Sequence, residues 1–170
     1  MDIDKLIYDS IIKDGFFDAL QKTETGGQSN PNKAVGDKGE SIGSLQIQKN
    51  YFNDAMVQYN KDTDLQKTFP ELKRITYDNV KDRDTAQKII YLYSKKYEPE
   101  LLQKKDYKSI ARLHNGGPTW NRQYDTKYIY PKKEKTKPNE RIPIGEYERV
   151  LWKNALQFSD KVMNNFLGVN

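Results

Sequence analysis

Residues 24–47 read ETGGQSNPNKAVGDKGESIGSLQI, and this stretch decides the fold. It starts with a Glu just past an apolar run of helical periodicity and continues through a segment rich in Gly and Asn. Such a segment ends a helix, and a Gly-Asp-Lys-Gly turn between two short stretches is typical of a β-hairpin. The stretch therefore predicts a helix that ends near Glu24 and a small hairpin over residues 33–47.

The flanking sequence is mostly helical in its pattern. Residues 3–23 carry apolar side chains at helical spacing, and Gly15 divides them into two helices. Further helices are expected over residues 48–60, from Asp82 or Asp84 to Tyr97, over 107–113 and over 146–167. A Lys-rich, Pro-containing stretch at 127–145 predicts an inserted, extended loop. The pattern indicates one domain over residues 1–170, of the α+β class and mostly helical.

Composition excludes several kinds of site. The 170 residues include no Cys and one His, so neither a disulfide, nor a thiolate metal site, nor a multi-histidine metal site is possible. We accordingly expect no metal and no cofactor. The acidic start, Met1-Asp2-Ile3-Asp4, does not resemble a signal peptide, and Gly15 follows too soon for a membrane span. The chain is therefore expected neither to export itself nor to insert into a membrane.

The net charge of +5 has two interpretations. A Lys-rich surface can simply be solvated, or it can attract a polyanion such as nucleic acid or the bacterial wall. Basic residues are interspersed with acidic ones and form no recognised nucleic-acid motif, which disfavours a nucleic-acid binder.

Two carboxyl groups fit the chemistry of glycosidic bond cleavage. That chemistry uses one carboxyl kept protonated in apolar surroundings and another kept ionised in a polar site. Glu24 fits the first role, because burial and the negative end of the helix dipole would both favour its protonated form. Asp37, on the hairpin turn, fits the second, with Glu40 as its rival. By position alone, Glu24 is better explained as an ordinary solvated residue beside a helix end, and Asp37 is also well explained as an ordinary turn residue.

The surrounding residues carry a family resemblance. The order of motifs resembles the core of the lysozyme-like superfamily: a Glu that ends a helix, then Asn-Pro, then Ser-x-Gly-x-x-Gln-Ile. In this chain the last motif is residues 41–47. The superfamily includes lytic transglycosylases and goose-type lysozymes. Invertebrate-type lysozymes look closer, since they match Tyr51-Phe52-Asn53-Asp54 and the run ARLHNGGP at 111–118. Their Tyr-containing final segment resembles GEYERV at 145–150.

This resemblance implies a lysozyme-like fold with a cleft between a helical lobe and the hairpin. It implies a muramidase that hydrolyses the β-1,4 bond between N-acetylmuramic acid and N-acetylglucosamine, with peptidoglycan glycan strands as partner. Glu24 would be the general acid and Asp37 the second carboxylate. The substrate-binding residues would be Ser41, Gly43 and Gln46 on the hairpin side, and His114, Asn115 and Gly116 on the opposite wall. An equally good interpretation of His114 is a helix-end residue whose ring hydrogen-bonds to the backbone and does not contact substrate.

Two departures qualify the resemblance. The invertebrate-type family is rich in disulfides and this chain has no Cys, which suits a bacterial or phage relative that acts at the bacterial wall as a monomer. Such a chain would be phage-encoded, delivered by a partner, or a mature fragment. Asp37 is also shifted by about one position relative to the family Asp. A lytic transglycosylase, and a non-catalytic wall-binding or phage structural module, therefore remain alternatives.

Overall fold

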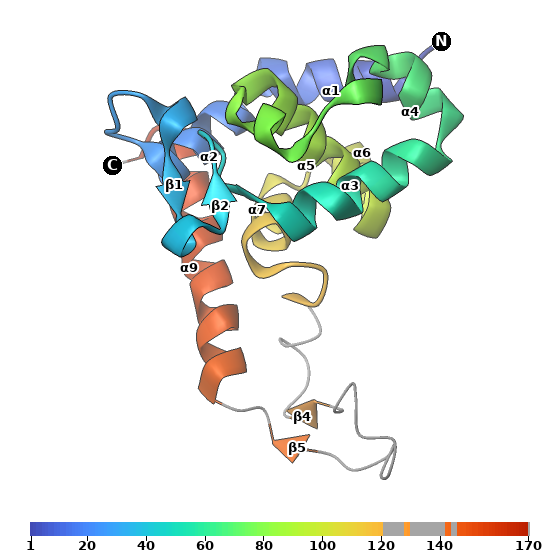
Figure 1. Cartoon of the computed structure of the whole chain (residues 1–170). Helices are drawn as coiled ribbons and strands as arrows, with labels where there is room; N and C mark the ends of the chain where they lie inside the picture. The colour runs from blue at the N-terminus through green and yellow to red at the C-terminus, as the bar shows by residue number, and fades with distance from the viewer. Residues whose placement is uncertain (121–127, 130–141, 144–145, 170) are drawn as a thin grey trace.

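The computed structural model describes residues 1–120, 128–129, 142–143 and 146–169, with side chains for 1–120 and 153–169. Its described part is mostly helical with a small antiparallel sheet, which confirms the predicted α+β, mostly helical class (Figure 1).

The first two helices form as predicted. α1 (Ile3–Asp14) is capped by the Asp2 side chain, which accepts from the backbone N–H of Lys5. Gly15 then adopts a left-handed conformation with φ of +84°, where other residues are strained, and α2 (Phe16–Thr25) follows at once. Gly15 therefore sets the angle between the two helices, and α2 ends one residue beyond Glu24.

The predicted hairpin is part of a three-stranded sheet. β1 (Val35–Gly36) pairs antiparallel with β2 (Ser41–Ile42) across the predicted turn, and β2 pairs antiparallel with β3 (Ile47–Gln48). The sequence missed the third strand, because its two residues are too few to show an alternating pattern. β3 leads directly into α3 (Lys49–Lys61), so the sheet is tied to the helical part of the molecule.

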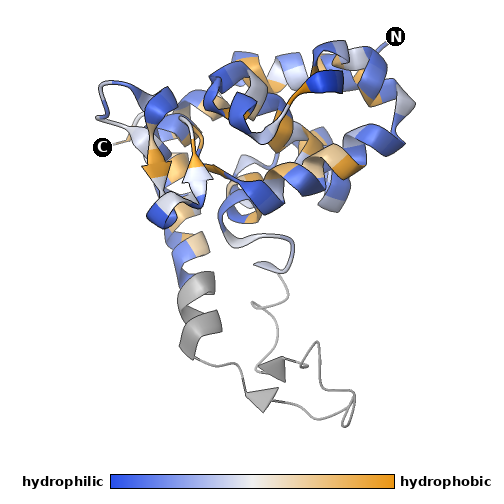
Figure 2. Ribbon diagram, in the orientation of Figure 1, coloured by the Kyte–Doolittle hydropathy of each residue, from blue (hydrophilic) through white to orange (hydrophobic). Residues whose placement is uncertain are grey.

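α5 (Arg83–Tyr97) lies at the centre of the helical part. Its N-cap is Asp82, and nearly every side chain from Ala86 to Ser94 is buried, as expected of a helix covered on all sides. α3 packs along it, and Figure 2 shows polar and apolar residues alternating on the outer helices. The core between these helices is rich in aromatic side chains, among them Phe16, Tyr59, Phe69 and Tyr91.

The C-terminal helix braces the site region. α9 (Glu146–Leu167) has the predicted bounds and packs against both α2 and α7 (Tyr107–Gly116). Ala155 and Val162 are buried, whereas residues 146–152 lie outside the described side chains. α7 extends three residues beyond the predicted end at Leu113, so His114 lies inside its last turn.

Short elements connect the long ones. They are η1 (Pro31–Lys33), η2 (Asp37–Gly39), α4 (Thr63–Thr68), η3 (Pro70–Arg74), η4 (Tyr77–Lys81) and α6 (Pro99–Lys104). Within the predicted loop at 127–145, β4 (Tyr128–Ile129) and β5 (Ile142–Pro143) pair antiparallel; the remainder of that prediction lies outside the described residues. No helix in the described part is both long and apolar enough to cross a membrane.

Candidate active site

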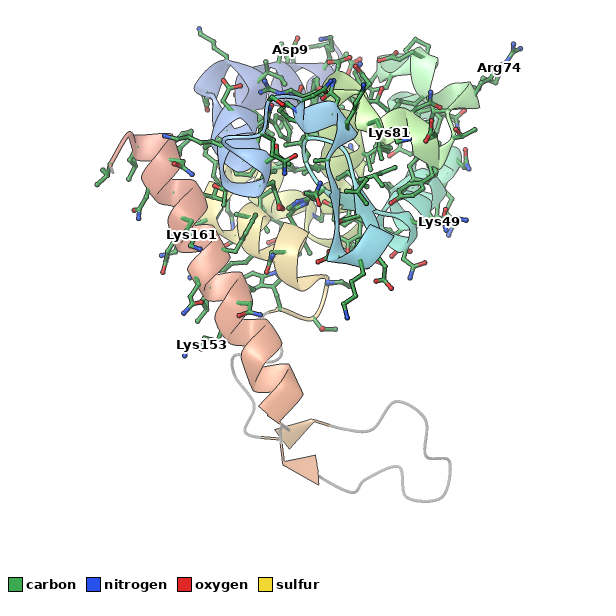
Figure 3. The ribbon with its side chains drawn as sticks, turned by 60° about the vertical axis from the view of Figure 1, so that its left-hand side comes forward. Asp9, Lys49, Arg74, Lys81, Lys153 and Lys161 are labelled. Carbon is green, nitrogen blue, oxygen red and sulfur yellow. The ribbon has the colours of Figure 1, made fainter. Side chains whose placement is uncertain are left out.

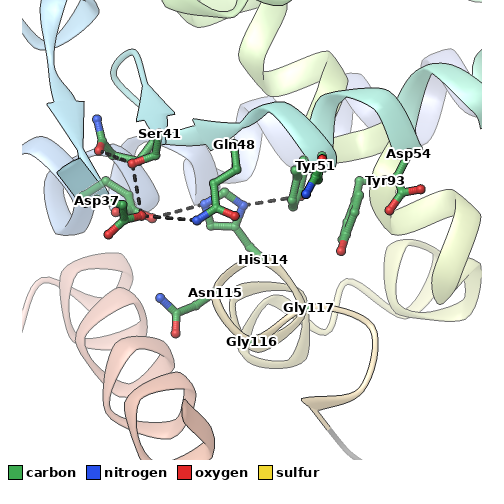
Figure 4. Close-up of a pocket in the computed structure, with 13 residues that line it drawn as sticks. Asp37, Ser41, Gln48, Tyr51, Asp54, Tyr93, His114, Asn115, Gly116 and Gly117 are labelled. Atoms are coloured by element: carbon green, nitrogen blue, oxygen red, sulfur yellow. Dashed lines mark hydrogen bonds and ion pairs between the residues drawn. The ribbon is translucent and has the colours of Figure 1, made fainter. Parts of the chain in front are cut away.

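A polar cavity of about 370 Å³ lies between the sheet and the helices (Figure 4). One side, which we call the hairpin wall, consists of Asp37, Ser41, Gln46 and Gln48. The other, the helical wall, consists of Glu24, Tyr51, Asp54, Tyr93 and residues 114–117, and Asn50 completes the lining. The structure thus brings together every predicted site residue except Gly43.

The Glu24 side chain contacts the ring of His114. The Nε2 atom of His114 lies 3.1 Å from Oε1 of Glu24, and the two side chains are 4% and 17% exposed. The next residue, Thr25, is buried and its hydroxyl donates a hydrogen bond of 2.9 Å to the carbonyl of Ser44. The end of α2 is therefore fixed to both α7 and the sheet.

Tyr51 holds the other side of the His114 ring. The Tyr51 hydroxyl lies 3.3 Å from Nδ1 of His114, and the Tyr51 ring stacks on Tyr93 with centroids 3.6 Å apart. Burial, together with the neighbouring Tyr93 and Glu24, raises the pKa of Tyr51 well above its ordinary value, so its hydroxyl stays protonated. A chain of contacts therefore runs from Glu24 through His114 to Tyr51.

His114 lines the cavity as predicted, with 4% of its side chain exposed. The alternative prediction, a ring bonded to the backbone of the helix end, is wrong, because both ring nitrogens face other side chains. Asn115, next along the chain, is exposed and lines the cavity as predicted.

On the hairpin wall, Asp37 is held by neutral donors. Its Oδ2 atom lies 3.2 Å from the Ser41 hydroxyl and accepts from Nε2 of Gln48 at 3.3 Å. The Ser41 hydroxyl also lies 2.9 Å from Oε1 of Gln46, so its single proton serves one acceptor at a time. Glu40, the rival second carboxylate, is exposed and is not part of the cavity lining. Of these two candidate carboxylates, only Asp37 lines the cavity.

The backbone of the hairpin wall is strained. Asp37, Lys38 and Gln46 have φ of 48°, 57° and 50°, in the left-handed region that favours Gly. Such conformations persist where the surrounding structure holds them, and they concentrate at functional sites. Two of the three residues contribute side chains to the cavity.

The prediction that Gly43 lines the cavity is wrong. Gly43 is buried with φ of +81°, and a Cβ there would lie 2.6 Å from the carbonyl oxygen of Val80. Its own carbonyl accepts a hydrogen bond of 2.8 Å from Nε2 of Gln46. Gly43 thus permits close contact between the sheet and η4, and its carbonyl orients the Gln46 side chain.

α9 fixes the two helices that carry Glu24 and His114. Asn165 donates to the Thr23 hydroxyl on α2 at 2.9 Å, and Arg112 on α7 donates to Ser159 at 3.1 Å. A Cβ at Gly116 would lie 3.0 Å from that of Ala155, so this glycine permits close packing of α7 on α9 as well as lining the cavity.

Four helical-wall residues were missed as site residues: Tyr51, Asp54, Tyr93 and Gly117. Tyr51, Asp54 and Gly117 lie within the runs 51–54 and 111–118 that carry the family resemblance, but the resemblance assigned them no role. Tyr93 lies within a predicted helix, and its helical spacing does not mark it as a site residue. Asp54 accepts from Lys96 at 2.7 Å and from Tyr97 at 2.8 Å, so it is anchored to α5.

The cavity has no Lys or Arg among its described lining residues, although it contains three carboxyl groups, Glu24, Asp37 and Asp54. Basic residues lie instead on the outer surface, where those labelled in Figure 3 come from α3, η3, η4 and α9. Among the described residues, no group of three or more His, Asp and Glu is placed to hold a metal ion. Comparison with protein-family models, curated proteins and solved structures finds no match for this chain, so the site is interpreted from its own geometry.

Proposed function

We propose that this protein is a lysozyme-like muramidase, which hydrolyses the β-1,4 bond between N-acetylmuramic acid and N-acetylglucosamine in peptidoglycan. The observation that carries the proposal is the Glu24 carboxyl, backed by the nearly buried His114 ring, in a cavity whose opposite wall holds Asp37. A pair of carboxyl groups in unlike surroundings is what most glycoside hydrolases use.

The surroundings of Glu24 suit a general acid. One of its oxygens, Oε1, is engaged by His114, and the side chain is largely buried yet reaches the cavity. Protonation of the leaving oxygen by a positioned carboxyl is worth roughly 10²–10⁴-fold in rate. Glu24 would therefore carry the larger part of the catalysis.

The surroundings of Asp37 suit the second carboxylate. It is exposed and accepts from neutral donors on one oxygen. An anion there would stabilise the positive charge that develops on the sugar ring, or attack the anomeric carbon. A lytic transglycosylase needs no such second carboxylate, so the presence of Asp37 in the cavity favours hydrolysis.

The charge of the cavity supports an uncharged glycan as ligand. Three carboxyl groups, with no Lys or Arg in the described lining, would repel the phosphates of nucleic acid, whereas amide and hydroxyl groups of acetylated sugars can donate to carboxylates. The polar hairpin wall and the Tyr51–Tyr93 stack provide both hydrogen-bonding and apolar surface for sugar rings.

The test is the clearing of purified peptidoglycan sacculi by Glu24→Gln. We expect this variant to lose at least about 10³-fold in activity, since the amide cannot supply the proton. Glu40→Gln is the matched control, because Glu40 is an exposed carboxylate outside the cavity lining, and it should clear sacculi at the wild-type rate. Near-normal activity of Glu24→Gln, with an unchanged melting temperature, would refute the proposal.

A further inference from the structure

We propose that Tyr51 and His114 act as positioning residues that keep the transferable proton of Glu24 on Oε2. This inference rests on the proposed function and adds the group that directs the acid. In this arrangement the Tyr51 hydroxyl donates to Nδ1 of His114, and the proton on Nε2 of His114 donates to Oε1 of Glu24.

The first step of the argument is the occupancy of the two Glu24 oxygens. Oε1 lies 3.1 Å from Nε2 of His114, while none of the described residues hydrogen-bonds Oε2. If Nε2 carries a proton, Oε1 is an acceptor and the carboxyl proton must sit on Oε2. If Nε2 lacks a proton, protonated Glu24 donates from Oε1 to His114, and that proton is withheld from a substrate.

The second step is the choice between the two His114 tautomers. The hydrogen bond at one ring nitrogen decides which nitrogen carries the proton. The Tyr51 hydroxyl faces Nδ1 at 3.3 Å and stays protonated, because burial raises the pKa of Tyr51. When it donates to Nδ1, the proton of neutral His114 must lie on Nε2. The opposite tautomer would leave the Tyr51 proton without an acceptor among the described residues, in a largely buried position.

The third step is the rigidity of the chain of contacts. Tyr51 is clamped by stacking on Tyr93, whose ring plane differs by 12°, and it meets the His114 ring edge-on. Phe158 of α9 covers His114 from another side with centroids 6.2 Å apart. The groups that face His114 are therefore Glu24 from α2, Tyr51 from α3 and the apolar ring of Phe158, while Asp37 lies across the cavity.

His114 is the only histidine in the chain, so its ring nitrogens can be assigned without ambiguity by ¹⁵N NMR. Glu24→Gln imitates the protonated carboxyl, which leaves Tyr51 as the group that sets the tautomer. We expect this variant to keep the proton on Nε2 in neutral His114, and the double variant Glu24→Gln, Tyr51→Phe to show both tautomers. Glu24→Gln with Tyr93→Phe is the matched control and should keep one tautomer. A mixed tautomer in Glu24→Gln alone, or a single Nε2 tautomer in the double variant, would overturn the proposal.

Kinetics separate positioning from substrate binding. Tyr51→Phe should lower kcat by about 10-fold with KM changed less than about twofold, because a fraction of Glu24 would then hold its proton on Oε1. His114→Gln, which can still donate to Oε1, should retain more activity than His114→Met at similar melting temperatures. A rise in KM with unchanged kcat, or equal losses in the two His114 variants, would contradict the positioning role.

The two proposals fail separately. The NMR measurement requires no turnover, so it decides the tautomer even if the wild-type protein does not cleave peptidoglycan. Conversely, an active wild-type enzyme whose Glu24→Gln form has mixed tautomers would retain the proposed function and lose this inference.

Discussion

The two walls of the cavity are built in different ways. On the helical wall, Glu24 and His114 are 90 residues apart in sequence and Tyr51 and His114 are 63 apart, so their contacts depend on the packing of separate helices. On the hairpin wall, the bonds among Asp37, Ser41, Gln46 and Gln48 span at most 11 residues. On the first wall, the Tyr51 and Tyr93 rings are buried and Glu24 is partly buried; the second wall is polar, and its Asp37 is exposed.

This difference matches the two carboxyl roles that we propose. A general acid benefits from a rigidly held position, and the packed helices hold Glu24 in place through His114 and Thr25. A second carboxylate benefits from neutral donors and solvent, and a strained polar turn provides those. The proposed roles of the two carboxyl groups therefore follow from the wall on which each one lies.

The largest expected effect on the hairpin wall comes from Asp37→Asn. The substitution keeps the shape of the side chain but removes the negative charge opposite Glu24, so we expect activity on sacculi to fall by roughly 10²-fold or more. The melting temperature should change little, because Asp37 is exposed and bonded only to neutral groups. Dye release from labelled sacculi measures the loss, and activity close to that of wild type would show that Glu24 acts without Asp37.

A smaller effect, on stability, is expected where the hairpin wall meets the helices. Gly43→Ala would place a Cβ 2.6 Å from a backbone oxygen at φ of +81°, and should cost about 2–3 kcal/mol in the free energy of unfolding. Gly39→Ala is the matched control: its φ is +102°, but a Cβ there meets nothing within 4 Å. Urea unfolding should show Gly43→Ala clearly less stable than Gly39→Ala. Equal losses would mean that the contact with Val80 does not hold the sheet in place.

The smallest effect is expected on the helical wall at Asp54, and it depends on pH. Partial burial raises the pKa of Asp54, but the hydrogen bonds from Lys96 and Tyr97 outweigh it and hold the pKa below its ordinary value. The resulting stability is present above the unfolded pKa of about 4 and is lost as the pH falls through the lower folded value. Asp54→Asn should therefore melt a few degrees below wild type at pH 7, by roughly the amount of one partly exposed ion pair.

The pH dependence supplies the control for that prediction. The difference in melting temperature between Asp54→Asn and wild type should shrink as the pH drops below about 4 and through the lower folded pKa of Asp54, since Asp54 then becomes uncharged like Asn. A difference that stays constant down to about pH 2 would mean that the charge of Asp54 does not stabilise α3 against α5.

The sequence predicted the hairpin wall better than the helical one, for a physical reason. Asp37, Ser41 and Gln46 belong to one local motif, so their spacing alone brings them together, and Gly15 and Asp82 marked helix ends through local backbone rules. The contacts of His114 with Glu24 and Tyr51 arise from tertiary packing, which no local pattern encodes. Gly43 was wrongly predicted to line the cavity. The motif shows that a glycine is needed at this position, but not whether the missing side chain makes room for a ligand or for a backbone carbonyl.

The most direct test of the central claim is the mass of the products from wild-type digestion of peptidoglycan, after reduction with borohydride. Hydrolysis by a muramidase predicts fragments that end in reduced N-acetylmuramic acid, with one water added per bond cleaved, and their loss in Glu24→Gln. Fragments that end in anhydro-muramic acid would identify a transglycosylase. Fragments ending in reduced N-acetylglucosamine, or no fragments at all, would contradict the proposed activity.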